Sequence, residues 1–174
     1  MANQLQSNYR IDLNGMILLS QILNFDLQPD NPELNPGTEQ PYILALPTYA
    51  AIARYHYPAA HRPEVLLEDC LKEVEHFAQN EYALALQSGD ELDADQRKAV
   101  ADRLAGYVGL PADLILKADL RFNAGTFEKT LQDARGLTVG RNDGRFAGPT
   151  MDRLSKEADY DPQSAAIGSL VPRI

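Results

Sequence analysis

The residues with the clearest chemical potential are two arginines on either side of an aspartate, Arg141, Asp143 and Arg145, in a glycine-flanked turn. A guanidinium group presents a fork of N–H donors that matches the two oxygens of a carboxylate. Arg141 and Arg145 are therefore candidate substrate-binding residues. The same three side chains could instead form an ion-pair network that ties the loop down, and the sequence leaves both interpretations open.

A second cluster of polar-tipped rings, Tyr49, Tyr55 and His56, falls within one predicted helix that begins at Pro47 and ends at Pro58. Rings with a polar tip suit the wall of a binding pocket, and they also suit a core helix whose tips reach its edge. We take these three residues as further candidates for substrate binding, with the core role as the alternative.

The sequence predicts neither a metal site nor a cofactor. His56 and His61 are five residues apart across Pro58, whereas two metal ligands on one helix face are four apart. His76 is expected at the surface or at the edge of the core. Cys70, the single cysteine, lies in a predicted helix beside Leu71 and is expected to be a small buried side chain rather than a nucleophile.

No catalytic residue can be assigned from motifs. A nucleophile elbow needs a small residue two places on either side of its serine, and no serine of this chain has that G-x-S-x-G setting. The glycine pair at 136 and 140 lacks the Lys-Ser/Thr that follows in a phosphate-binding loop. The chain therefore contains no complete active site that sequence motifs reveal.

Composition narrows the class of protein. The chain has 174 residues with ordinary apolar and charged fractions, which suits one folded domain. A net charge of -9 argues against nucleic acid as a partner, because phosphates attract clustered Lys and Arg. No apolar stretch approaches the ~18 residues that span a bilayer, so we predict no membrane partner. No signal peptide is visible at the N-terminus.

The hydrophobic pattern predicts a single strand followed by helices. Residues 11–24 contain an apolar run typical of a strand buried on both faces of a sheet. Such a strand needs hydrogen-bonding neighbours on both sides, which suggests that the chain is part of something larger. Residues 26–41 are rich in proline and polar residues and are predicted to be a linker loop.

The later helices carry clear end signals. A helix from Pro63 to Ser88-Gly89 has one apolar stripe, and the next is expected to begin at Asp93, with Gln96 completing a capping box, and to stop near Gly109. Short helices should follow after Pro111 and at Thr126, and Thr126 is the expected cap of the second one. Leu137-Thr138-Val139-Gly140 could be extended, and residues 151–174 are predicted to be an irregular tail.

The acidic residues are concentrated in one part of the chain. Residues 64–95 contain ten acids and one base, Lys72. The acids are expected to form a solvated helix face, and the alternative is an acidic surface that docks a basic partner.

Several segments together resemble the serine carboxypeptidase family, particularly its bacterial branch. The resemblance runs in order from residues 13–20 to about Asp161-Pro162. Its segments are residues 13–20, Pro41-Tyr42, residues 46–51, Tyr55-His56, residues 73–78 with Glu81-Tyr82, residues 109–111, Leu120-Arg121, and residues 137–149.

That resemblance implies part of an α/β-hydrolase fold. Residues 1–25 would be the end of the helix after the nucleophile and one core strand, and residues 42–150 would form the helical cap above the active site. The expected fold is thus mainly α with one or two short strands. The family cleaves C-terminal residues from peptides with a Ser, Asp, His triad, all of whose members would lie outside this chain. Alone it should be inactive.

The resemblance also sets expectations about partners. They would be the peptide substrate in the intact enzyme and the remainder of the hydrolase core. Family members are commonly exported, and the compartment of this chain stays open. The alternative is a stand-alone helical interaction module, which docks a partner through its acidic helix or forms a homo-oligomer through its unpaired strand.

Overall fold

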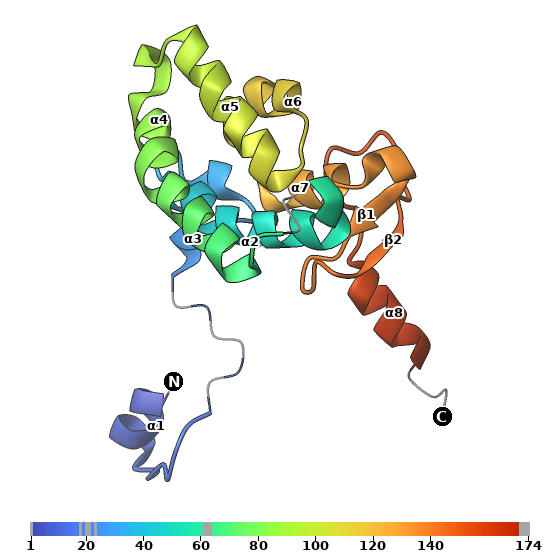
Figure 1. Ribbon diagram of the computed structural model, residues 1–174. Helices are drawn as coiled ribbons and strands as arrows, with labels where there is room; N and C mark the ends of the chain where they lie inside the picture. Colours follow the sequence, from blue (N-terminus) through green and yellow to red (C-terminus); the bar gives the residue numbers. More distant parts are fainter. Residues whose placement is uncertain (1, 18, 20–21, 23, 61–63, 171–174) are drawn as a thin grey trace.

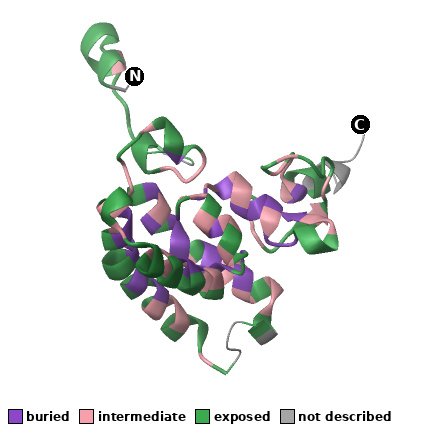
Figure 2. Ribbon diagram, turned by 90° about the horizontal axis from the view of Figure 1, so that it is seen from above, coloured by how far each residue is buried: buried purple, intermediate pink, exposed green. Residues whose placement is uncertain are grey.

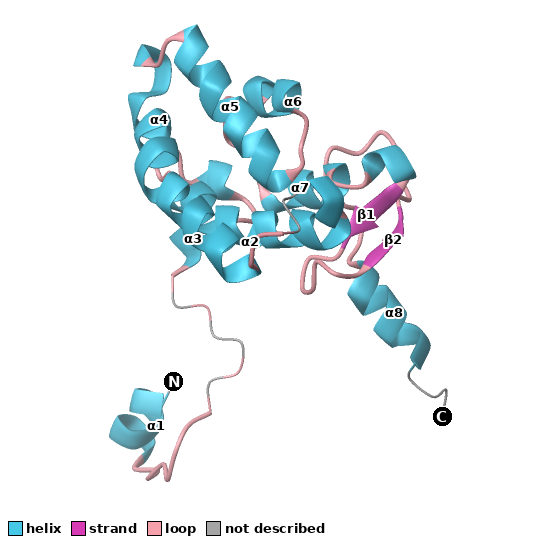
Figure 3. Cartoon of the chain, in the orientation of Figure 1, coloured by secondary structure: helices cyan, strands magenta, loops and turns pink. Residues whose placement is uncertain are grey.

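The computed structural model describes residues 2–17, 19, 22, 24–60 and 64–170, and this part is mainly helical with one small antiparallel sheet (Figure 3). His61 and Pro63, and the end of the tail at 171–174, lie outside the described residues. No helix among the described residues is both long enough and apolar enough to cross a membrane.

The central helix, α2 (Gln40–His56), begins seven residues before the predicted start at Pro47. Pro41 lies in the first turn, where the missing N–H costs nothing. Pro47 lies inside the helix, where it leaves the Ile43 carbonyl without its usual donor. Burial of residues on both sides of Pro47, such as Leu46 and Ala50, holds the helix together across this position.

The predicted helix that ends at Gly89 is present as three continuous parts: α3 (Leu67–Phe77), a π-helical turn η4 (Ala78–Tyr82) and α4 (Ala83–Ser88). Val74, Phe77, Tyr82 and Leu86 from these parts are buried. Gly89 follows with φ of 52°, a left-handed conformation that glycine adopts without strain.

The end signals of the next helix are confirmed. In α5 (Ala94–Val108) the Asp93 side chain accepts a hydrogen bond from the backbone N–H of Gln96 at 2.8 Å, and Gly109 adopts the left-handed cap. α6 (Ala112–Lys117) begins after Pro111, as expected, and packs against α5.

The last helix of the body, α7 (Ala124–Thr130), is capped by Asn123 rather than by Thr126. The Asn123 side chain accepts from the Thr126 backbone N–H at 2.8 Å, so Thr126 is the third helical residue. A short helical turn, η6 (Asp133–Arg135), then leads to the sheet. β1 (Leu137–Val139) pairs antiparallel with β2 (Ala147–Pro149), with Thr138 opposite Gly148.

The core lies between α2, the α3–α4 helix, α5 and α7 (Figures 1 and 2). Its largest fully buried side chains come from all of these elements and their connections: Leu46, Val74, Phe77, Tyr82, Leu86, Leu104, Val108, Ile115, Leu120, Phe127, Gln132 and Val139. The helical region therefore has a core of its own.

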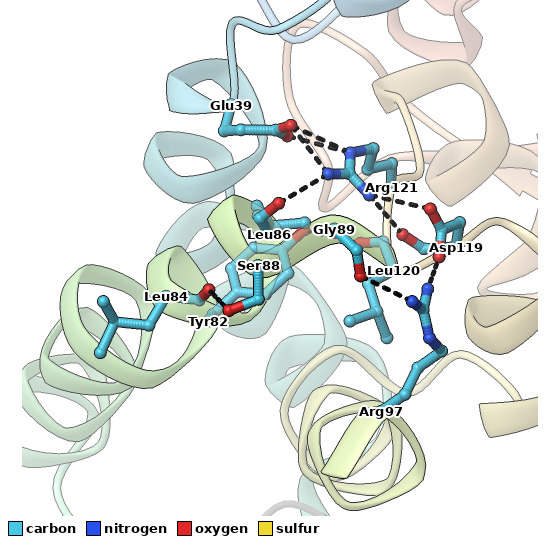
Figure 4. A network of polar contacts seen from close by, with 10 residues as sticks. All are labelled: Glu39, Tyr82, Leu84, Leu86, Ser88, Gly89, Arg97, Asp119, Leu120 and Arg121. Carbon is cyan, nitrogen blue, oxygen red and sulfur yellow. Dashed lines mark hydrogen bonds and ion pairs between the residues drawn. The ribbon is translucent and has the colours of Figure 1, made fainter. Parts of the chain in front are cut away.

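Arg121 connects three parts of this body (Figure 4). Its guanidinium donates to both carboxylate oxygens of Glu39 just before α2, at 2.8–3.2 Å, and to the Leu86 carbonyl in α4 at 2.9 Å. It also pairs with Asp119, which in turn pairs with Arg97 of α5. Glu39 and Asp119 thus neutralise a half-buried guanidinium between α2, α4 and the segment after α6.

The same network stabilises a strained stretch of backbone. Asp119 and Leu120 have φ of 51° and 64°, a region that side chains other than glycine rarely adopt. The Tyr82 hydroxyl donates to the Leu120 carbonyl at 2.7 Å, and the Leu120 side chain is buried. Polar contacts and burial together therefore offset the cost of two consecutive left-handed residues.

The predicted strand at 11–24 is wrong for the residues that the structure describes there, none of which is in a strand. Of the described residues between the short helix α1 (Ala2–Tyr9) and α2, none pairs with the sheet (Figure 1). Ile17 and Leu19 are 93% and 88% exposed. A strand forms only where its backbone finds partners, and β1 and β2, the strands of the described chain, pair with each other.

The linker and tail predictions also need correction at their ends. Residues 26–41 contain two short helical turns, η1 (Phe25–Leu27) and η2 (Pro32–Leu34), before α2 begins. The tail expected to be irregular contains a helix, α8 (Pro162–Leu170). The Asp161 side chain accepts from the Gln163 backbone N–H and the Ser164 hydroxyl, which caps this helix where no apolar period announces it.

Candidate functional site

A groove of about 360 Å³ lies where α2, α7, the loop at 28–30 and the loop at 140–142 meet. The polar and ionisable side chains of its lining come from three places: Tyr49 from α2, Glu128 from α7, and Asp30 and Arg141 from the two loops. We call it the Glu128 groove. Asp30, Glu128 and Arg141 also line an adjoining polar hollow of about 290 Å³, which contains Glu157, Asp159 and Asp161.

The local fold explains how these residues come together. The backbone N–H of Ala124 donates to the Pro29 carbonyl at 2.9 Å, which fixes the loop at 28–30 against the start of α7. The backbone N–H of Gly140 donates to the Phe146 carbonyl at 2.9 Å and closes the loop that carries Arg141. The groove is thus built from segments more than 90 residues apart.

Glu128 is a buried carboxylic acid with only 8% of its surface exposed. Burial raises its pKa from the ordinary 4.5 to about 7, because the charged form loses its hydration. Arg141 opposes this shift, while the negative charges of Asp30, Asp161 and Glu157 add to it. Near neutral pH this side chain therefore exchanges between its acidic and its ionised form.

Arg141 is already engaged by acidic groups. Its guanidinium pairs with the Asp30 carboxylate at 2.5 Å, and its backbone N–H donates to Asp161 at 3.2 Å. The pairing with Asp30 joins the loop after β1 to the loop before α2. These contacts fit the interpretation of Arg141 as a structural tie, and its place in the groove lining leaves the substrate-binding interpretation as a prediction.

Tyr49 forms part of the groove floor. Its ring stacks on Phe127 with 4.3 Å between the ring centroids, and only 6% of the residue is exposed. Its hydroxyl is buried and has no hydrogen-bond partner. Burial, and next the charge of Glu128, raise the pKa of Tyr49, so its hydroxyl stays protonated. An unpartnered buried hydroxyl is costly and marks a place where a polar ligand atom would be favourable.

The other candidates lie away from this groove. His56 accepts a hydrogen bond at Nδ1 from the Gln132 amide, at 2.6 Å, and donates from Nε2 to the Gly144 carbonyl, at 2.6 Å. Gln132 in turn accepts from Arg135 at 2.9 Å. Both ring nitrogens are used, so His56 ties α2 to the loop at 140–146. Tyr55 is 58% exposed and lies edge-on to the His56 ring.

Arg145 bonds to Asp143 of its own turn through both carboxylate oxygens, at 2.6–3.2 Å. The guanidinium of Arg145 lowers the pKa of this aspartate to about 2. Arg145 and Asp143 thus form a local clamp within one turn. Of the five candidate residues, the structure brings Tyr49 and Arg141 into the groove and leaves Tyr55, His56 and Arg145 outside its lining.

Sequence reasoning missed Glu128 and Asp30. A glutamate in a short helix usually faces solvent, and Glu128 stands between Phe127 and Lys129, both of which are buried as well. α7 is buried on most of its circumference, and no hydrophobic periodicity in its sequence indicates this. Asp30 follows Pro29 in a proline-rich stretch, and nothing in the sequence distinguishes it from an ordinary polar loop residue.

The acidic part of the chain is partly neutralised by contacts within the protein. Glu81 pairs with Arg103, and Glu73 accepts a hydrogen bond from the Tyr107 hydroxyl at 3.0 Å. Lys72 pairs with Glu68 one turn before it on α3. Of these contacts, the ion pair with Arg103 of α5 lowers the surplus of charge below the count from the sequence, which already includes Lys72.

Cys70 is half-buried and lines a different, mostly apolar hollow of about 260 Å³ with Ala50 and Tyr107. No group of three or more metal-binding side chains occurs among the residues that the structure describes. In comparisons with known proteins, no family model, no curated protein and no solved structure matches this chain.

Proposed function

We propose that this chain is the cap region of a serine-type carboxypeptidase that removes C-terminal residues from peptides, and that residues 11–24 would pair as a strand only within the sheet of the intact enzyme. The observation that carries the proposal is the contrast between two parts of the chain. Residues 40–149 have a core of their own, whereas the segment at 11–24 exposes Ile17 and Leu19 almost completely. A sequence suited to a central strand, exposed in this way, is what a strand separated from its sheet would look like.

In such an enzyme the cap would cover the substrate, exclude water and shape the pocket for the departing residue. A serine activated by a histidine, outside this chain, would attack the last peptide carbonyl. Of the five candidate residues, Tyr49 and Arg141 line the Glu128 groove, and Arg141 is held there by its ion pair with Asp30. His56 and Arg145 are engaged in contacts within the cap, and Tyr55 is exposed outside the groove. Alone, the chain should hydrolyse nothing.

The DNA that flanks this reading frame tests the proposal. A G-x-S-x-G elbow encoded upstream, and segments with an aspartate and then a histidine encoded downstream, would support a peptidase with this chain as its middle. Flanks on both sides that encode none of these would contradict it. Expression with such flanks should then yield a product labelled by a serine-reactive phosphonate.

The alternative proposal is a stand-alone interaction module that docks a basic partner. The observation in its favour is the exposure of four acids before, along and after α3: Glu64, Glu75, Asp90 and Glu91. Self-association through residues 11–24 is the second form of this alternative. Sedimentation over a wide concentration range distinguishes it, because a monomer at high concentration would contradict pairing through that segment.

A further inference from the structure

We propose that the Glu128 groove binds a small primary alkylammonium ion, with its charged head between Glu128 and Tyr49. This site goes beyond the proposed peptidase role and does not depend on it. The alkyl body of the ligand would lie on the apolar side of the groove, which Ile52 and Phe127 line.

The charges around the groove favour a cation. The groove and the adjoining hollow contain five carboxyl groups and one guanidinium, that of Arg141. Arg141 is paired with Asp30, so its charge is not free for an incoming anion. A cation beside Glu128 would instead relieve the repulsion that this carboxyl feels from Asp30, Asp161 and Glu157.

A buried carboxyl beside an unpartnered hydroxyl favours an ammonium head. Glu128 is more than nine-tenths buried, and the buried hydroxyl of Tyr49 has no partner. A primary ammonium has three N–H donors and no acceptor. It can donate to the Glu128 carboxylate and to the Tyr49 oxygen, which would give that buried oxygen a partner.

The apolar wall selects an alkyl body over a bare ion. Ile52, Ala124 and Phe127 line the side of the groove next to these two polar groups. Removing alkyl surface from water contributes roughly 25 cal/mol per Å². A hydrated metal ion gains nothing from such a wall, and no metal-binding cluster occurs in the described part of the chain.

The test is calorimetric titration of the 174-residue chain with isopentylamine at pH 7.5 and low salt. Isopentanol, of the same shape without the charge, is the matched control ligand. We expect saturable binding of the amine and no binding of the alcohol. Equal binding of both, or binding of neither, would overturn the proposal.

Variants separate this site from general attraction to an acidic protein. Glu128→Gln should weaken the amine at least about tenfold, the loss expected for one charge-assisted hydrogen bond. Glu75→Gln, which removes an exposed charge from α3, should leave the affinity unchanged. A thermal melt establishes that each variant is folded. Equal affinities in the two variants would contradict the site.

Arg141→Ala gives the sharpest contrast, because the direction in which it changes the affinity depends on the charge of the ligand. Removal of this guanidinium frees Asp30 and strengthens the negative field at Glu128, so the amine should bind several-fold more tightly. Weaker binding in Arg141→Ala would overturn the assignment of a cation. Leucine amide, which has the ammonium of a peptide N-terminus, shows by its affinity relative to isopentylamine which source the groove prefers.

Proton release gives a second readout. The groups that face Glu128 are Tyr49 from α2, Asp30, Arg141, and Glu157 and Asp161 before α8. Since the cation requires ionised Glu128, its affinity should rise between pH 6 and 8, and the heat should vary with the ionisation enthalpy of the buffer. A buffer-independent heat at pH 6.5 would count against Glu128 as the contact.

Discussion

His56 donates a hydrogen bond from Nε2 to the carbonyl of Gly144, 88 residues later in the chain, at 2.6 Å. Its other ring nitrogen accepts from Gln132, which is almost completely buried. The ring thus joins α2, the segment after α7 and the loop after β1. His56 therefore stabilises the loop at 140–146 that presents Arg141 to the Glu128 groove.

Replacement of His56 should lower stability. His56→Ala leaves the Gln132 amide and the Gly144 carbonyl without their partner, which should cost about 1–3 kcal/mol in the free energy of unfolding. Urea denaturation measures it. His76→Ala, an exposed histidine on α3, is the matched control and should change stability by less than about 0.5 kcal/mol. Equal effects of both substitutions would contradict the structural role.

Arg121 should be the most sensitive charged residue outside the groove. Arg121→Ala removes the contacts to Glu39, Asp119 and Leu86. Part of the cost of the left-handed backbone at residues 119–120 is then no longer offset. We expect a loss of about 2–4 kcal/mol, and only partial rescue in Arg121→Lys, because an ammonium cannot reproduce the bidentate pair. The control is Lys117→Ala, an exposed cation at the end of α6. A loss below 1 kcal/mol in urea denaturation would contradict this account.

The raised pKa of Glu128 predicts how the stability of the fold depends on pH. Its folded pKa of about 7 lies above the ordinary 4.5, so the folded state holds a proton that the unfolded state releases. The stability that this bound proton contributes is fully present below pH 4.5 and is lost as pH rises to 7. Glu128→Gln should therefore be more stable than the native chain above pH 7, by on the order of 2 kcal/mol.

The control for this prediction is Glu75→Gln, which should keep the native pH profile. Thermal melts between pH 4.5 and 8 compare the three proteins. A native profile in Glu128→Gln would show that this carboxyl ionises normally in the fold and would remove the charge argument for the groove.

Two glycines should respond oppositely to alanine. A Cβ at Gly144 would lie 2.5 Å from Cδ1 of Ile52, so Gly144→Ala should cost about 1–3 kcal/mol. A Cβ at Gly106 in α5 meets no atom within 4 Å, and Gly106→Ala should stabilise by about 0.5–1 kcal/mol. In the Ile52→Ala background, Gly144→Ala should lower the stability by less than it does in the native chain. Thermal denaturation of the variants and the double variant measures this coupling.

The parts of the fold that sequence predicts well are those with local causes. Asp93 and Gly109 bound α5 because a cap depends on residues within one helical turn. Thr126 was a wrong cap because Asn123, three residues earlier, offers the same chemistry. The sequence predicts the start of α2 too late, because proline is typical of a first helical turn, whereas tertiary packing holds Pro47 inside the helix.

The parts that sequence predicts poorly depend on distant partners. The apolar run at 11–24 has the composition of a buried strand, but composition does not supply the neighbouring strands. The Glu128 groove joins residues near 30, 49, 128 and 141, and its buried acid has no local signal. Tyr49 and Arg141, chosen for their chemistry, both line this groove, and their role in binding stays a prediction. His56 is held by two structural hydrogen bonds.

The most direct test of the central claim is the hydrolysis of a blocked dipeptide by two proteins. One is this 174-residue chain, and the other is the product of the reading frame extended in both directions. Release of the C-terminal residue by the extended product, blocked by a serine-reactive phosphonate, and no release by the chain alone, is the predicted result. Hydrolysis by the chain alone, or an inert extended product that the phosphonate does not label, would contradict the account.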